Sequence, residues 1–128
     1  MIIPTTLFYT KNHEWIGINP EEVKVGITEY GQELLGDIIE VSVNTVGKFL
    51  KQQDVFGTLK ASEKIFNLHL PVSGTILEVN PKLSINPVFI NESPYFKGWI
   101  IKVKIREPKE YNSLLIHWKY RRLIGEDS

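Results

Sequence analysis

Residues 56–74 decide the fold, and they read Phe-Gly-Thr-Leu-Lys-Ala-Ser-Glu-Lys-Ile-Phe-Asn-Leu-His-Leu-Pro-Val-Ser-Gly. Apolar residues gather on both sides of a short segment, residues 60–64, that is polar or small. This arrangement predicts two strands joined by a solvated hairpin tip. Pro71 and Gly74 predict the end of the second strand, because proline lacks a donor for the ladder and glycine favours a turn. Val72 between them is expected to point into the core.

Alternating apolar residues predict further strands on both sides of this hairpin. Residues 23–27 alternate valine or isoleucine with lysine and glycine, and residues 99–105 are apolar at every second position. A period of two is typical of a half-buried strand. Turn residues separate such segments at intervals of about 8–12 residues, and a short extended segment is expected at residues 88–90. The spacing predicts a mainly β chain, built as a small sandwich or barrel.

Two peripheral helices are predicted beside the strands. Thr28 can cap a short helix near residues 29–35, and Gly36 is suited to end it. A C-terminal helix is predicted near residues 110–124, because apolar residues recur there at helical spacing. Basic residues follow near its carboxyl end, where cations complement the helix dipole.

The composition excludes several classes of function. The chain has 128 residues, 15 Lys and Arg against 15 Asp and Glu, and no cysteine. A net charge of zero gives no reason to expect nucleic acid or an anionic membrane as a partner. The lack of cysteine excludes disulfides, thiolate catalysis and cysteine–zinc sites. With no signal-peptide pattern and no apolar run of membrane-spanning length, we expect a single domain over residues 1–128, located in the cytoplasm.

Four ordered blocks of sequence, together with Phe56-Gly57 before the hairpin tip, carry a family resemblance. The matching residues are Tyr9-Thr10 and His13-Glu14-Trp15; Val25-Gly26-Ile27-Thr28, Tyr30, Gln32-Glu33 and Leu35-Gly36-Asp37-Ile38; Pro71-Val72-Ser73-Gly74 with Glu78-Val79-Asn80; and Asn91-Glu92, Pro94-Tyr95 and Gly98-Trp99. The set is far more specific than any one block, because order and spacing are both kept. Over residues 8–105 the chain resembles the H protein of the glycine cleavage system.

This resemblance implies a lipoyl/biotinyl-type fold, a barrel-sandwich hybrid of two antiparallel sheets with a lipoyl lysine on a hairpin. Members of the family carry an aminomethyl group from glycine decarboxylase, the P-protein, to an aminomethyltransferase. They then present the dithiol to dihydrolipoyl dehydrogenase, and a lipoate ligase handles the arm. These enzymes are the implied partners in glycine decarboxylation. The family has no catalytic residues of its own, so we expect a non-catalytic carrier or binding protein.

The hairpin tip departs from the family at the residue that carries lipoate. The family pattern resembles Glu-Ser-x-Lys-Ala at a fixed distance before Pro-Val-Ser-Gly. In ungapped register Glu63 occupies the lysine position and Lys60 the glutamate position, while Lys64 is one residue late. Glu63 has no amine to acylate, and a one-residue shift in a strand turns a side chain to the other face. A β-bulge could turn Lys64 outward again.

Two functions therefore remain open. The first is an H-protein-like homologue that is not lipoylated at the usual tip position and acts as a binding or accessory protein. The alternative is a working lipoyl carrier of aminomethyl groups that uses Lys64, with lipoate as its cofactor. An autonomous enzyme is a third class, and the sequence contains no nucleophile–base constellation that would support it.

His13 and Glu14 are the remaining candidate cofactor-binding residues. They match the opening of the family, in which an acidic residue lies near the cleft that shelters the loaded arm. His69, in the second strand of the hairpin, is interpreted as a half-exposed sheet residue. The three histidines, completed by His117, show no metal-ligand spacing, so no metal site is expected.

Overall fold

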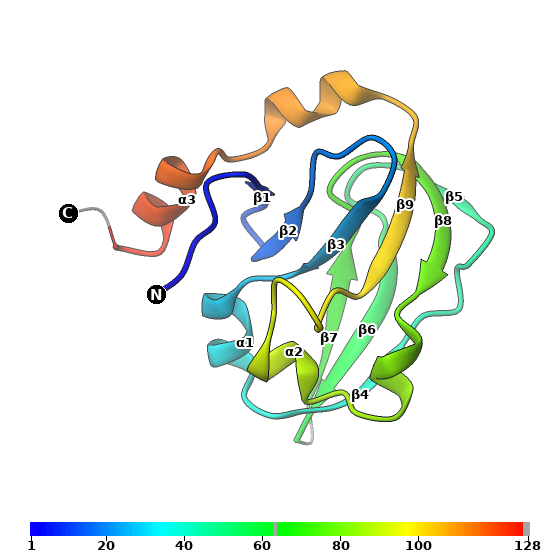
Figure 1. Ribbon diagram of the computed structural model, residues 1–128, viewed down its shortest axis with the longest axis vertical. Coiled ribbons are helices and arrows are strands. Elements are labelled where there is room, and N and C mark those ends of the chain that lie inside the picture. Colours follow the sequence, from blue (N-terminus) through cyan, green and yellow to red (C-terminus); the bar gives the residue numbers. More distant parts are fainter. Residues whose placement is uncertain (63, 127–128) are drawn as a thin grey trace.

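Two antiparallel sheets form the body of the chain (Figure 1). The computed structural model describes residues 1–62 and 64–126. Within them, one sheet has six strands in the order β1-β2-β3-β9-β8-β5, and the other has three in the order β4-β6-β7. The predicted mainly β architecture is thereby confirmed. The strands are β1 (Phe8–Tyr9), β2 (Glu14–Ile16), β3 (Val23–Ile27), β4 (Ile38–Ser42), β5 (Phe49–Leu50), β6 (Val55–Ala61), β7 (Lys64–His69), β8 (Gly74–Val79) and β9 (Ile101–Ile105).

Apolar side chains from the two sheets meet in the core. Val25 and Val103 come from the six-stranded sheet, Leu59 and Leu68 come from the three-stranded sheet, and none is more than 2 % exposed. The alternation within the strands places these residues on one face, and burial stabilises each by about 1.5–3 kcal/mol. Val72, between β7 and β8, is fully buried in the same core, as expected from the sequence.

The helix predicted at residues 29–35 is confirmed as α1 (Glu29–Leu35). The Thr28 hydroxyl oxygen caps it by accepting a hydrogen bond from the Gly31 amide at 3.0 Å. Such a cap satisfies one of the amides that lack a partner in the first helical turn. Gly36 ends the helix with a φ of 81°, a left-handed conformation that glycine adopts without steric cost.

The prediction of an extended segment at residues 88–90 is wrong. The 3-10 helix η1 (Pro81–Ser84) is followed by the short helix α2 (Phe89–Glu92). Pro87 has no amide for a strand ladder, but its carbonyl accepts a hydrogen bond from the Ile90 amide at 3.1 Å. The local bonds of a helical turn therefore replace the pairing of a strand.

The predicted C-terminal helix is present but shorter than residues 110–124. It is divided into the 3-10 helix η2 (Pro108–Ser113) and α3 (His117–Leu123). Between them the amide and carbonyl of Leu115 each bond to Tyr9 at 2.8 Å, so this stretch is extended and extends the sheet beyond β1. Among the helices of the described residues, none has the length and apolar character needed to cross a membrane.

Candidate functional site

Strands β6 and β7 form the hairpin that the sequence predicted, but the predicted tip of residues 60–64 is too long, because Lys60, Ala61 and Lys64 are paired in the ladder. Their pairing is regular from Gly57 opposite Leu68 to Ala61 opposite Lys64, and the one register shift lies at the far end, between Val55 and Gly57. Strand β6 therefore ends at Ala61, and β7 begins at Lys64. Ser62 has a φ of 56°, as a tight hairpin turn requires. Glu63, which the ungapped register of the sequence assigns to the family's lysine position, lies outside the described residues.

Lys64 is part of the ladder rather than of the turn. It is exposed at the start of β7, directly opposite Ala61. Because side chains alternate along a strand, Lys64 shares a face with Phe66 and Leu68, whereas Ile65 lies on the other face. The described part of the hairpin has no bulge near the tip that would change this phase.

A groove of about 520 Å³ runs beside β7. Strand β7 and Leu59 of β6 form one wall, and α1 with residues 11–14 forms the other. Apolar side chains occupy much of its length, and polar side chains gather where it meets β2. The lining residues are Lys11, Asn12, His13, Glu14, Ile27, Gly31, Leu34, Leu35, Leu59, Ile65, Phe66, Asn67, Leu68 and His69.

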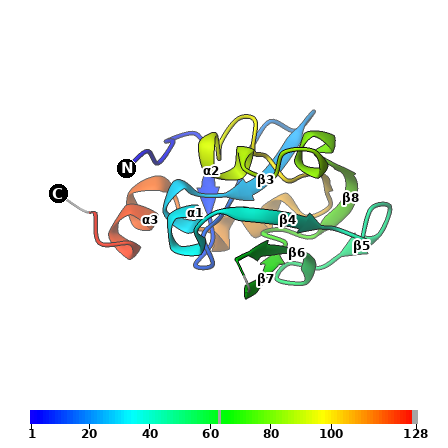
Figure 2. The ribbon, with the colours of Figure 1, turned by 90° about the horizontal axis from the view of Figure 1, so that it is seen from below.

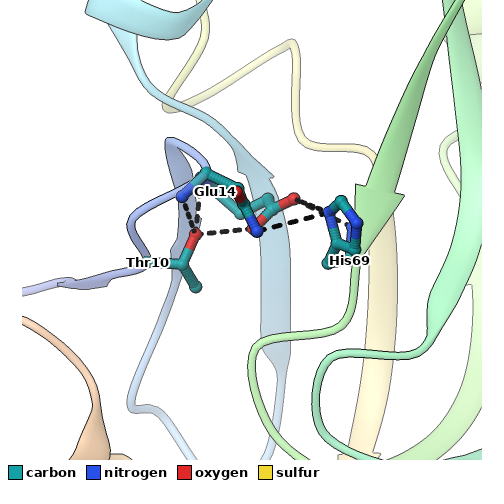
Figure 3. A network of polar contacts seen from close by, with 4 residues as sticks. Thr10, Glu14 and His69 are labelled. Atoms are coloured by element: carbon teal, nitrogen blue, oxygen red, sulfur yellow. Dashed lines mark hydrogen bonds and ion pairs between the residues drawn. The ribbon is translucent and has the colours of Figure 1, made fainter.

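Glu14 is a buried acid at the polar end of this groove (Figure 3). It is 1 % exposed, and burial raises the pKa of its carboxyl above the ordinary value, with the bonds to Thr10 and His69 opposing the rise. The Thr10 hydroxyl donates to Oε1 at 2.5 Å, and the backbone amide of His69 donates to Oε2 at 2.8 Å. The His69 ring nitrogen Nδ1 lies 3.2 Å from the same Oε2. Glu14 thus ties β2 of one sheet to the outer edge of β7 in the other.

His13 is held in the groove wall by the C-terminal helix. Its Nδ1 lies 2.8 Å from the Tyr120 hydroxyl, which is also 2.6 Å from the Thr28 hydroxyl at the cap of α1. Burial lowers the pKa of His13. The residue has a φ of 69°, which a non-glycine residue rarely adopts. Tyr120 is fully buried and stacks on Tyr9 with ring centroids 4.7 Å apart.

The structure therefore places His13 and Glu14 in one groove and shows partners that the sequence alone did not assign to them. His69 does more than occupy a half-exposed sheet position, because its amide and ring both contact Glu14. Thr10 and Tyr120 complete the two networks. Thr10 is four residues before Glu14, a spacing that could have suggested contact, whereas no local pattern connects Tyr120 to His13. Within residues 1–62 and 64–126, no three His, Cys, Asp or Glu side chains are grouped closely enough to hold a metal ion.

The comparisons with known proteins agree with the fold and with the sequence blocks around the groove. The family model for the glycine cleavage H-protein matches residues 7–127. The chain belongs to the glycine cleavage H-protein family. It is 38 % identical over 126 residues to the glycine cleavage system H protein of Staphylococcus carnosus (strain TM300), covering 98 % of this chain and all of that protein. H proteins are carriers rather than catalysts, so the expected non-catalytic character agrees with the family.

A solved H protein shares the three-dimensional arrangement. The crystal structure of a glycine cleavage system H protein from Mycobacterium marinum superimposes with a TM-score of 0.83 at 32 % identity. The match covers 96 % of this chain and 99 % of that one. The two antiparallel sheets of this H-protein homologue are therefore those of the family, a barrel-sandwich hybrid.

Proposed function

We propose that this H-protein homologue is not lipoylated at the usual tip position and acts as a non-catalytic binding or accessory protein. The observation that carries the proposal is the regular pairing of Ala61 with Lys64. Lys64 is therefore part of the ladder, one residue after Glu63, which the ungapped register assigns to the family's lysine position.

The residues at the tip do not fit the lipoyl group in the family's geometry. A glutamate side chain cannot form the amide that joins lipoate to a lysine amine. Lys64 has the amine, but it starts the β7 ladder on the face that Phe66 and Leu68 share. A ligase that recognises a lysine presented at the turn meets Lys64 in a different direction.

The groove supports a binding role without an attached arm. The Glu14 carboxylate accepts hydrogen bonds from the Thr10 hydroxyl and the His69 amide, so the chain itself satisfies the acid. In the apolar part of the groove, the side chains of Leu34 and Ile65 are 60 % and 67 % exposed. We propose that His13 and Glu14 shape the polar end of a partner-contacting cleft. Candidate partners are the glycine decarboxylase P-protein, the aminomethyltransferase, dihydrolipoyl dehydrogenase and a lipoate ligase.

The second candidate function is a working lipoyl carrier that uses Lys64. Its favouring observation is the exposure of Lys64 at the first position of β7, since a long lysine stem can reach around the end of a hairpin. The two functions make opposite predictions for one measurement.

That measurement is intact mass after incubation with lipoate ligase, ATP and lipoate. We expect no mass increase for the natural chain and an increase of one lipoyl group for Glu63→Lys. The double variant Lys60→Glu with Glu63→Lys should be modified at least as well, because it restores the family's acidic residue. Lys64→Arg is the matched control, and combining it with Glu63→Lys should leave the modification intact. Efficient modification of the natural chain that Lys64→Arg abolishes would establish the carrier instead.

A further inference from the structure

A second hollow, of about 410 Å³, lies away from the groove. It opens where β3, η1 and the loop before β9 meet, whereas the groove follows β7. Figure 2 shows α2 and β3 on one side of the molecule and β6 and β7 on the other. The lining residues are Lys24, Glu78, Asn80, Pro81, Lys82, Tyr95, Phe96, Lys97 and Trp99.

Backbone and side-chain hydrogen bonds hold the walls of this hollow in place. Asn80 is buried, and its side-chain amide donates to the carbonyls of Lys97 and Trp99, both at 2.8 Å. Its carbonyl oxygen accepts from the Lys82 amide at 3.1 Å. Gly98 packs so closely against α2 that a Cβ there would lie 2.5 Å from the Phe89 carbonyl oxygen. The loop that carries the aromatic residues is therefore fixed before any partner binds.

Aromatic surface lies open at the centre of this fixed frame. Phe96 is 80 % exposed, although the loop that carries it is bonded through the Phe96 and Gly98 amides to the Ser93 carbonyl. Trp99 is half-buried beside it in the lining of the hollow. An exposed aromatic side chain on an ordered loop retains apolar surface that a partner can bury at little cost in ordering the loop.

Lysines surround this aromatic surface. The ammonium groups of Lys24 and Lys102 lie 5.4 and 5.0 Å from the Trp99 ring centroid. These two lysines are direct cross-strand partners, an arrangement that repels unless acids compensate. Glu22 lies 2.9 Å from Lys24 and 3.9 Å from Lys102, and Glu78 lies 3.9 Å from Lys102.

These acids leave the lysines in excess. Lys82 and Lys97 add two exposed cations at the rim of the hollow, so four lysines face two glutamates. A neutral chain thus concentrates positive charge around one aromatic patch. That pattern complements a partner that carries carboxylates on both sides of an apolar side chain.

We propose that this hollow, formed by Lys24, Lys82, Lys97, Phe96 and Trp99, is a docking site for an acidic segment of a partner protein. Carboxylates of the segment pair with Lys82 and Lys97, and an apolar side chain between them packs on Phe96 and Trp99. Lysine acts as a point charge on a flexible stem, so carboxylates at varied spacing can be held. The site goes beyond the proposed function of the groove and does not depend on it.

The test is an NMR titration of the full chain with the peptide acetyl-Glu-Glu-Phe-Glu-Glu-amide, following the indole N–H of Trp99. The Trp118 indole on α3 is the internal reference. We expect the peptide to shift the Trp99 signal and to leave Trp118 unmoved. Lys82→Glu with Lys97→Glu should raise the dissociation constant at least about tenfold. Lys48→Glu with Lys109→Glu is the matched control, because it changes the net charge equally at exposed positions outside the hollow, and it should change the constant less than about twofold.

Several outcomes would overturn the docking site. An unshifted Trp99 signal would mean that the peptide does not bind in the hollow. Equal weakening by both double variants would mean that general charge attraction accounts for the binding. The hollow would be a site for small anions if two results were found together. Inorganic phosphate or ATP would displace the peptide at matched ionic strength, and Phe96→Ala would leave the affinity for the peptide unchanged. A loss of affinity in Phe96→Ala with an unchanged circular dichroism spectrum supports the aromatic contact.

Discussion

Removal of one buried hydroxyl, in Tyr120→Phe, should destabilise the chain by about 1–3 kcal/mol. The hydroxyl is 2.8 Å from Nδ1 of His13 and 2.6 Å from the Thr28 hydroxyl. Thr28 is fully buried, so no water readily replaces the lost partner. The stack on Tyr9 should survive, because phenylalanine keeps the ring. The change in unfolding free energy therefore reports the hydrogen bonds of this hydroxyl. It corresponds to a folding equilibrium constant lower by about 5- to 150-fold.

Urea unfolding followed by circular dichroism measures this loss. Tyr111→Phe is the control, since its hydroxyl makes a single 2.7 Å bond to the Gly17 carbonyl and should cost about 0.5–1.5 kcal/mol. Tyr120→Phe should also speed hydrogen exchange at the Gly31 amide, because the cap of α1 loses its support. A change in unfolding free energy below about 0.5 kcal/mol, with exchange at Gly31 unaltered, would refute the role given to the hydroxyl.

Three further changes test the core, the groove and the fixed loop. Val72→Asp should lower the free energy of unfolding by roughly 3 kcal/mol or more, because Val72 is fully buried and the aspartate would have no partner. An unchanged melting temperature would contradict this. Burial raises the pKa of Glu14 above its ordinary value, so the folded chain binds that proton more tightly than the unfolded chain does. The natural chain should then lose stability as the pH rises from about 4.5 through the folded pKa, and Glu14→Gln should lack this slope in urea titrations at a series of pH values. Gly98→Ala should lower the melting temperature, because its Cβ would lie 2.5 Å from the Phe89 carbonyl oxygen; a stability equal to that of the natural chain would mean that the loop relaxes freely.

The hairpin and the helix cap could be predicted from sequence because their causes are local. Apolar residues on both sides of a short polar segment predicted two strands, and β6 and β7 pair regularly from Gly57 opposite Leu68 to Ala61 opposite Lys64. Thr28 caps α1 through an amide only three residues away. The ordered blocks from Tyr9 to Trp99 also indicated the family, because spacing records the lengths of strands and loops that must fit together.

The local patterns were less informative where the chain had two ways to satisfy its backbone. The apolar spacing of residues 110–124 is helical, yet Leu115 pairs with Tyr9 and divides the helix. Residues 88–90 contain residues suited to a strand, but Pro87 has no amide for a ladder, and its carbonyl accepts a hydrogen bond from the Ile90 amide instead. The first outcome depends on a distant partner, and the second depends on local bonds that compete with a strand.

The sequence by itself determined the two-sheet family fold and the buried position of Val72. Only the tertiary structure decided that Lys64 lies in a regular ladder and that Glu14 bonds to His69. It also decided that Tyr120, 107 residues after His13, supports the groove wall. The physical reason is range: strand alternation and capping act over a few residues, whereas a hydrogen bond between distant residues forms only after both sheets and the C-terminal segment have packed.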